Sequence, residues 1–512
     1  MNTKSWLVGL VALTSLTAIG GSVHADPPSD HASRAEELIL GLDLDEARKE
    51  LAAGDPDDPN IALEKGRLAL YEADCDGAVT MLSRPEIAKS EQGSALADIA
   101  RGCARVTAAT VVDKNVEPSV EVRYQDEADR AMTPFIVETV VKARDALTRD
   151  IGATWPKPTR IIVVRDLLSL SQMTGLPYES AQTTGTVAVA KWGRVTLLSP
   201  RASHHGYAWR DTIAHELTHL AVTRATVDRA PLWLQEGVAK REEIRWREPG
   251  VFDDRPPVDA VVSRGMELKL DLALDKLGPS IAMLPSADAA MVAFAEVTSF
   301  VRFFAATSSP DALPHLLLGL RQRKTPDAAL KEASGFDLKQ WDLKWRAHIA
   351  AKPNEALPAL FALGSEPPNM KELRDRVRLA ELLLGRNHAP EALVELDHLK
   401  GASLDDPSVR YIRARALVDA GRGKEAEPLL GDPKEVVASY GPWWAIRGTM
   451  ARSKGDGPTA DSSFVEAVAA DPLEIECACQ SADPQADLPA DPGLRLLCEA
   501  ARARGEPPLG AD

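Results

Sequence analysis

The chain lacks any cluster of basic residues, and its 512 residues carry a formal net charge of −16. Nucleic acids and anionic membrane surfaces both favour proteins with clustered Lys and Arg. The sequence therefore argues against either as the main partner, and we expect no nucleic acid to bind. A chain of this length is also too long for a single hydrophobic core, so two to four domains are expected.

Beyond its N-terminus, the sequence also lacks an apolar segment long enough to span a membrane. The N-terminus has Lys4, an apolar run over residues 6–19, and the small residues Val23 and Ala25. This run is shorter than the roughly 18–20 residues that cross a bilayer. The pattern is typical of a secretory signal peptide over residues 1–25, with an N-terminal membrane anchor as the alternative. We expect an exported protein, periplasmic or secreted, with no membrane span after cleavage.

Cysteine is scarce, and the five cysteines lack zinc-finger spacing, which excludes that class of metal site. In an oxidising compartment, a disulfide between Cys75 and Cys103 is plausible, as is one between Cys498 and either Cys477 or Cys479. The odd number leaves one thiol over. Buried unpaired cysteines are the alternative for each pair.

Composition divides the mature chain into helical and mixed regions. The sequence predicts N-terminal helical repeats at 26–115, a mixed domain at 116–350, a Pro-rich linker at 351–368, C-terminal repeats at 369–475 and a Cys-containing acidic tail at 476–512. Three β-branched segments of the mixed region predict strands: Thr159–Val164, Thr186–Ala190 and Arg194–Leu198. The last two flank Lys191–Gly193, which predicts a hairpin turn. The expected fold class is α+β, flanked by all-α regions.

Small residues recur with a period of 34 in the C-terminal helices. The residues with this spacing are Ala392, Ala426 and Ala460, then Leu396, Leu430 and Phe464, and, twelve positions before each alanine, Ala380, Ala414 and Gly448. The pattern resembles the tetratricopeptide repeat, whose arrays present a concave surface to a protein partner. A fainter copy pairs Ala35 with Ala47 and Gly66 with Ala78. Generic antiparallel helices with an alanine seam are the alternative.

The segment DTIAHELTHLAV places His215 and His219 four residues apart, with Glu216 directly after the first. On a helix, positions i and i+4 share a face, so both imidazoles can bind one ion. Glu216 lies off that face but close to a metal-bound water. A catalytic zinc site needs a third protein ligand, and Glu236 offers one from the helix predicted to follow. The sequence therefore predicts a metal site at these residues.

The stretch HELTH followed by PLWLQEGVA is similar to the gluzincin metallopeptidases, specifically to exported peptidase-MA-like proteins that often carry tetratricopeptide repeats. The resemblance extends over roughly residues 116–350 and implies a thermolysin-like domain with a small mixed sheet, the motif helix and C-terminal helices. It implies one zinc ion (Zn2+) per chain on His215, His219 and Glu236, with Glu216 as the general base that takes a proton from the zinc-bound water. It also implies a hairpin strand along which an extended peptide substrate adds.

The sequence departs from these relatives at two positions. Where they commonly carry a tyrosine that faces the oxyanion, this chain has Phe294, and where thermolysin-like members place a histidine-orienting aspartate, it has Lys240. Losing one oxyanion donor typically costs about 100- to 1,000-fold in rate. Tyr207, His204 or His205 could supply the missing donor, with a plain polar loop as the alternative for that segment.

Three functions remain compatible with the sequence. The first is an exported zinc endopeptidase whose repeats bind substrate or a protein partner. The second is a zinc-binding but weakly active or inactive protein that serves as a repeat-based scaffold, and the third is a structural helical protein with an accidental motif. The intact Glu216 favours the first, because a scaffold needs the ligands but not the base, whereas Phe294 favours the second.

Overall fold

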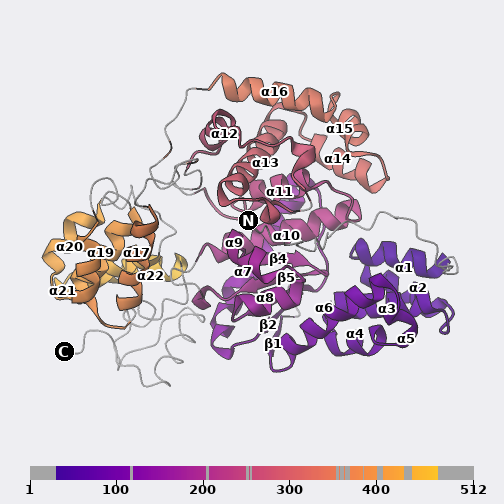
Figure 1. The fold of residues 1–512 in the computed structure, drawn as a ribbon, viewed down its shortest axis with the longest axis horizontal. Coiled ribbons are helices and arrows are strands. Elements are labelled where there is room, and N and C mark those ends of the chain that lie inside the picture. Colours follow the sequence, from indigo (N-terminus) through magenta and orange to yellow (C-terminus); the bar gives the residue numbers. More distant parts are fainter. Residues whose placement is uncertain are drawn as a thin grey trace, which may run out of the picture.

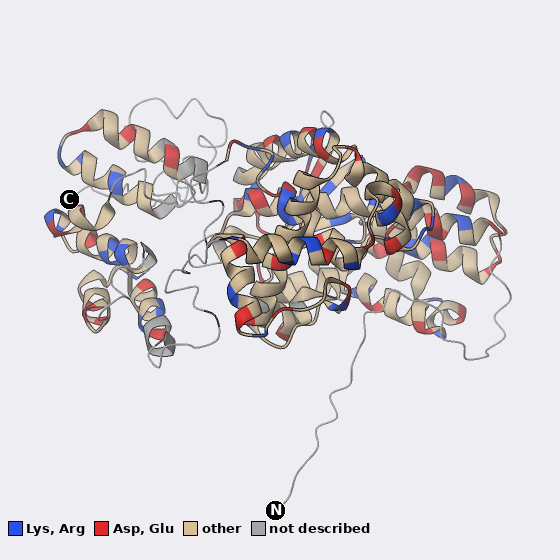
Figure 2. Ribbon diagram, turned by 90° about the horizontal axis from the view of Figure 1, so that it is seen from above, with Lys and Arg blue, Asp and Glu red and all other residues tan. Residues whose placement is uncertain are grey.

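The computed structural model describes residues 30–470, apart from 116–118, 203–206, 250–252, 254–255, 279, 353–356, 358–362, 364–369, 385, 400–406 and 432–440. The predicted signal peptide, most of the predicted linker and the tail with Cys477, Cys479 and Cys498 lie outside the described residues. Figure 1 shows N-terminal helices, a central part that contains the sheet, and a C-terminal group of helices. Lys and Arg are interspersed with Asp and Glu over all three parts (Figure 2).

One small mixed sheet lies in the central part of an otherwise mostly helical fold. Its strands are β1 (Val111–Asn115), β2 (Val120–Tyr124), β3 (Thr159–Val164), β4 (Ala188–Lys191) and β5 (Arg194–Leu198), in the order β1-β2-β3-β5-β4. β2, β3 and β5 run parallel, and β1 and β4 pair antiparallel at the two edges. The predicted strands all form, and β1 adds a strand within the region predicted as helical repeats. The sheet therefore begins before residue 116.

The hairpin predicted around residues 191–193 is confirmed. Trp192 and Gly193 both have positive φ, at 55° and 68°, which makes a two-residue turn with the backbone twist that suits a hairpin. Lys191 pairs with Arg194 across it. The Trp192 ring packs edge-on against Tyr71 at 5.9 Å between centroids, so the N-terminal helices support the turn. This turn leaves β4 at the edge of the sheet.

The N-terminal helices pack onto the sheet. They are α1 (Asp30–Leu40), α2 (Leu44–Ala53), α3 (Pro59–Tyr71), α4 (Cys75–Leu82), α5 (Pro85–Ala88) and α6 (Glu91–Thr107). The predicted pairs lie in helical hairpins: Ala35, Ala47 and Ala78 are buried, and a Cβ on Gly66 would lie 2.6 Å from Leu82. Arg194 of β5, fully buried, donates to the Leu70 carbonyl. These helices therefore share a core with the central part, and their assignment as repeats stays a prediction.

The motif helix α10 contacts β4 and β5 of the sheet and lies between them and α11 (Figure 1). The α-helices of the central part are α7 (Thr133–Ile151), α8 (Leu167–Thr174), α9 (Tyr178–Thr184), α10 (Trp209–Thr226), α11 (Leu232–Glu242), α12 (Val258–Glu267), α13 (Ala287–Thr307), α14 (Ala312–Arg321), α15 (Pro326–Ser334) and α16 (Leu338–Ala350). Short 3-10 turns are η1 (Glu127–Met132), η2 (Pro200–Ala202), η3 (Leu274–Lys276) and η4 (Ile281–Met283). Ile213, Leu217 and Leu220 anchor α10 in the core.

The expectation that no segment beyond the N-terminus is long and apolar enough to cross a membrane was wrong for helix α13, which meets that test by length and composition alone. In the folded chain it is a core helix, because 67% of its apolar window is buried. Val297 and Phe300 are fully buried, and Phe300 packs edge-on against both Trp233 and Trp345. Its apolar character is therefore accounted for by packing.

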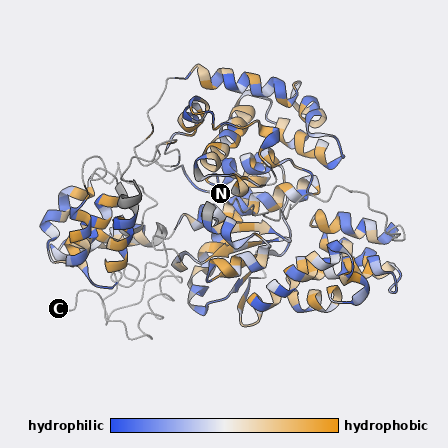
Figure 3. Ribbon diagram, in the orientation of Figure 1, coloured by the Kyte–Doolittle hydropathy of each residue, from blue (hydrophilic) through white to orange (hydrophobic). Residues whose placement is uncertain are grey.

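The C-terminal part forms three helical hairpins. Its helices are α17 (Met370–Leu384), α18 (Ala389–Asp397), α19 (Pro407–Asp419), α20 (Gly423–Leu430), α21 (Gly441–Ser453) and α22 (Gly457–Ala470), and hydrophobic and hydrophilic residues alternate along them (Figure 3). The small residues of the 34-residue period are buried: Ala380, Ala392, Ala414, Ala426 and Ala460 are fully covered. A Cβ on Gly448 would lie 2.5 Å from the Phe464 ring. Close helix contact thus explains the small residues, and the tetratricopeptide assignment itself stays a prediction.

Candidate metal centre

Helix α10 brings the three residues of the HELTH motif together. Ligand-type atoms of His215, Glu216 and His219 all lie within 4.8 Å of one another. The two Nε2 atoms of His215 and His219 are 3.2 Å apart, as the i, i+4 spacing predicts. Glu216 is 7% exposed, so its carboxylate is largely shielded from bulk water.

Glu236 reaches the same point from the next helix. α10 ends at Thr226, the next two residues Val227 and Asp228 both have positive φ, and α11 begins after Pro231. Oε2 of Glu236 then lies 3.7 Å from Nε2 of His215 and 3.6 Å from Nε2 of His219. The structure therefore brings all three predicted ligands into one cluster.

The spacing of these three atoms fits a tetrahedral zinc ion. Zn–N and Zn–O bonds of about 2.0–2.2 Å with tetrahedral angles place ligand atoms about 3.3–3.6 Å apart. The observed sides of the triangle are 3.2, 3.6 and 3.7 Å. Two imidazoles and one carboxylate are also the donor set of many catalytic zinc sites, which keep a fourth position for water. His215, His219 and Glu236 could therefore hold a zinc ion with little movement.

Each of the two histidines also makes a hydrogen bond through Nδ1, the ring nitrogen that does not face the other histidine. The Nδ1 of His219 lies 3.2 Å from the amide oxygen of Gln235, which only accepts, and Gln235 in turn donates to Thr223 at 3.4 Å. The Nδ1 of His215 lies 3.1 Å from Oε2 of Glu243. A proton on each Nδ1 leaves the Nε2 lone pairs free to bind a metal.

Glu243 and Gln235 are the residues that the sequence reasoning missed. Gln235 directly precedes Glu236, and Glu243 follows it by seven residues, which is two helical turns along the same face. That i+7 spacing is the signal that was available. Lys240 was noted only as a departure, but its Nζ donates to both carboxylate oxygens of Glu243, at 2.9 and 3.2 Å.

The electrostatics of the cluster favour a positive charge between its carboxylates. Burial opposes a charge on His215, but hydrogen bonds to Glu236 and Glu243 outweigh it and raise the pKa of His215 to about 9. Burial also disfavours ionised Glu243, yet His215 and Lys240 outweigh it and lower the Glu243 pKa to about 2. The pKa of Glu236 is lowered in the same way by the two histidines, against its burial. Such an environment suits a bound cation.

The two departures from the resembled family lie against each other. Phe294 of α13 is partly buried, and the Nζ of Lys240 lies 5.7 Å from the centre of its ring. Tyr207 donates its hydroxyl hydrogen to the carbonyl of Leu198, at the end of β5. His204 and His205 lie outside the described residues. An oxyanion donor is therefore not assigned by these contacts.

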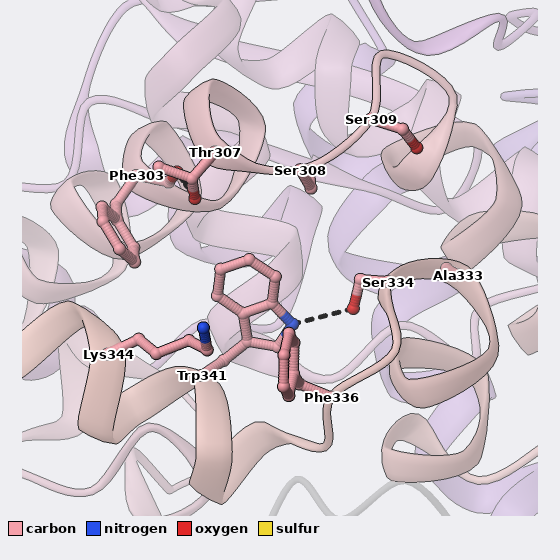
Figure 4. Close-up of a pocket in the computed structure, with 9 residues that line it drawn as sticks. All are labelled: Phe303, Thr307, Ser308, Ser309, Ala333, Ser334, Phe336, Trp341 and Lys344. Carbon is pink, nitrogen blue, oxygen red and sulfur yellow. Dashed lines mark hydrogen bonds between the residues drawn. The ribbon is translucent and has the colours of Figure 1, made fainter.

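A separate cavity of about 560 Å³ lies among α13, α15 and α16 (Figure 4). The Trp341 indole lies at its centre and donates to Ser334 at 2.7 Å, while Phe303 and Phe336 pack edge-on against it. Lys344 lies over the Phe336 ring at 4.2 Å. None of the residues that line this cavity belongs to α10 or α11, so it is no part of the histidine cluster.

Comparison with known proteins places the cluster within a family match. Residues 139–351, less than half of the chain, match the family model described as the Peptidase MA superfamily. The match includes α10, α11 and α13, and a mostly helical domain with a small mixed sheet is consistent with it. No curated protein matches the chain. The matched region is thus similar to zinc metallopeptidases, and proteins of this superfamily are typically zinc-dependent.

Proposed function

We propose that this chain is an exported zinc-dependent metallopeptidase that hydrolyses peptide bonds as an endopeptidase, with an extended substrate bound along the edge of its sheet. One observation carries the proposal: Nε2 of His215, Nε2 of His219 and Oε2 of Glu236 form a triangle of zinc-ligand dimensions. The family match to residues 139–351 supports it independently.

Glu216 would act as the general base. It follows His215 directly on α10, so it points about 100° away from the ligand face but stays within 4.8 Å of the histidine nitrogens. A zinc ion in the cluster would lower the pKa of a water molecule and polarise the substrate carbonyl. Glu216 can then take the proton from the attacking water and pass it to the leaving amine. Its burial shields this proton transfer from bulk water.

Strand β4 would bind the substrate backbone. It lies at the edge of the described sheet, where its outer hydrogen-bonding groups can pair with another extended chain. β4 also contacts α10, the helix that carries the two histidines. An extended peptide added along Ala188–Lys191 would therefore run past the metal cluster.

The helical hairpins would bind substrate or a protein partner, and the chain would act in the periplasm or outside the cell.

After export the chain should begin at Asp26 and keep the disulfide between Cys75 and Cys103, which the structure forms across 28 residues. Closing a loop of this length stabilises a fold by about 3–4 kcal/mol in the chain-entropy account. N-terminal sequencing of the exported protein tests the start at Asp26. Denaturant unfolding of the Cys75→Ser/Cys103→Ser variant measures how much the disulfide contributes to the free energy of unfolding. An intact Met1 with five free thiols would contradict export.

The alternative function is a zinc-binding, weakly active scaffold, and Phe294 is the observation that favours it. If α13 faces the cleft, Phe294→Tyr would place a hydroxyl near the developing oxyanion and raise kcat at least tenfold, worth about 1.4 kcal/mol, with little change in KM. Steady-state kinetics and thermal melting test this. A lowered melting temperature with unchanged kcat would show a buried hydroxyl without a partner and would point to Tyr207 as the next residue to replace.

A direct test of the proposed function uses residues 26–512 and a casein-type substrate. Hydrolysis should stop when a chelator removes the metal and should return on addition of zinc. Zinc binding without any hydrolysis would favour the scaffold. Absence of zinc binding would favour a structural helical protein.

A further inference from the structure

We propose that Glu243, whose carboxylate accepts two hydrogen bonds from Lys240, is the positioning residue for the metal ligand His215. The inference rests on the proposed zinc site and adds to it the two residues that hold one ligand in place. It assigns a role to Lys240, which stands where thermolysin-like relatives carry an aspartate. Glu243 follows Lys240 by three residues, at the C-cap of α11.

The contact between Glu243 and His215 fixes the imidazole. Oε2 of Glu243 is 3.1 Å from Nδ1 of His215, the nitrogen that points away from the cluster. Glu243 is the C-cap residue of α11, and its N–H bonds to the Ala239 carbonyl, so its backbone is anchored to the helix that also carries Glu236. One helix thus supplies both a ligand and the support for a second ligand. Outer contacts of this kind orient the ring and raise its basicity.

Lys240 holds the carboxylate of Glu243 at two points. Its Nζ donates to Oε2 at 2.9 Å and to Oε1 at 3.2 Å, which restricts rotation of the carboxylate. The Phe294 ring, 5.7 Å away, gives the ammonium group a further favourable contact. The two departures from the relatives, at Lys240 and Phe294, are therefore parts of one arrangement.

Lys240 also balances the charge around the cluster. Glu216, Glu236 and Glu243 are three carboxylates, and Lys240 is the ammonium group that bonds to one of them. A divalent cation on the proposed ligands would cancel the formal charge of these four side chains. The other histidine differs, because His219 is held by the neutral amide of Gln235.

The first test measures the zinc dissociation constant by competition with a chelator. Glu243→Gln keeps an oxygen that can accept from Nδ1 but loses the charge, so we expect binding about 10-fold weaker. Glu243→Leu loses the acceptor and should bind about 100-fold weaker, the upper end for such outer contacts. The matched controls are Glu332→Gln and Lys324→Met, which break an ion pair between α15 and the residues before it and should leave zinc binding unchanged.

The second test asks whether Lys240 acts through Glu243. Lys240→Met alone removes the hydrogen bonds that hold Glu243, which should weaken zinc binding. It also removes a positive charge that repels the zinc ion, which should strengthen binding, so the two effects oppose each other. In the Glu243→Gln background only the repulsion remains, and Lys240→Met should then strengthen zinc binding. We expect the two substitutions to be non-additive by at least fivefold in the dissociation constant. Additive effects would overturn the role of Lys240.

The metal-free proteins separate positioning from folding. Melting temperatures without zinc should fall equally for Glu243→Gln and Glu243→Leu, or not at all, while their zinc affinities differ. If the wild-type chain binds zinc and both Glu243 variants bind it equally well, the role of Glu243 is overturned and the proposed zinc site stands. A wild-type chain that binds no zinc would overturn the metal site, and this inference with it.

Discussion

Replacing Glu216 with glutamine should abolish hydrolysis of a casein-type substrate while the protein keeps its zinc. The carboxylate lies beside the two histidines but is not part of the ligand triangle. Its loss therefore removes proton transfer and leaves the metal in place. General-base catalysis contributes about 100- to 10,000-fold in rate, so the variant should lose at least 100-fold in kcat.

The measurement pairs zinc content with steady-state kinetics on the same preparation. Glu332→Gln, an exposed carboxylate on α15, is the control and should match the parent in both. A Glu216→Gln protein that digests substrate as fast as the parent would show that the assigned mechanism is wrong. Loss of zinc from this variant would instead make Glu216 a ligand.

Removing one predicted ligand has the second large effect. His219→Ala or Glu236→Ala should lose most of the zinc, because two protein ligands cannot complete a catalytic site. Glu236 also supplies the carboxylate of the ligand triangle, at 3.6 and 3.7 Å from the two imidazole nitrogens. Zinc content after gel filtration measures the loss, and hydrolysis should fall in proportion.

The neighbouring residue offers a graded control for this prediction. Gln235→Ala removes the support behind His219 but no ligand, so zinc should bind about 10- to 100-fold more weakly and still occupy the site at saturation. Stoichiometric zinc in both ligand variants would mean that the ligands have been chosen wrongly.

Local patterns in the sequence predicted the parts of the fold that depend on local physics. The strand at Thr159–Val164 and the turn before Arg194 follow from β-branched runs and turn residues, and both form as predicted. His215 and His219 meet because their spacing is that of one helical face. The approach of Glu236 followed from Pro231, which suits a helix start, and from a spacing that lets the chain turn back after the first helix.

Contacts between distant segments could not be read from the sequence. Nothing near residue 194 indicates that a buried arginine will bond to the Leu70 carbonyl and tie the N-terminal helices to the sheet. β1 was missed because its residues, VVDKN, alternate poorly and follow a long helix. Lys240 was interpreted only as a departure from the resembled family, because its hydrogen bond to Glu243, one helical turn further along the chain, depends on where both side chains lie around His215.

The position of a bound zinc ion tests the central claim most directly. Crystals of residues 26–512, purified without chelator, would be measured at the zinc absorption edge. We expect one anomalous peak per chain, about 2.0–2.2 Å from Nε2 of His215, Nε2 of His219 and a carboxylate oxygen of Glu236. The absence of zinc, or a peak bound by other residues, would contradict the account.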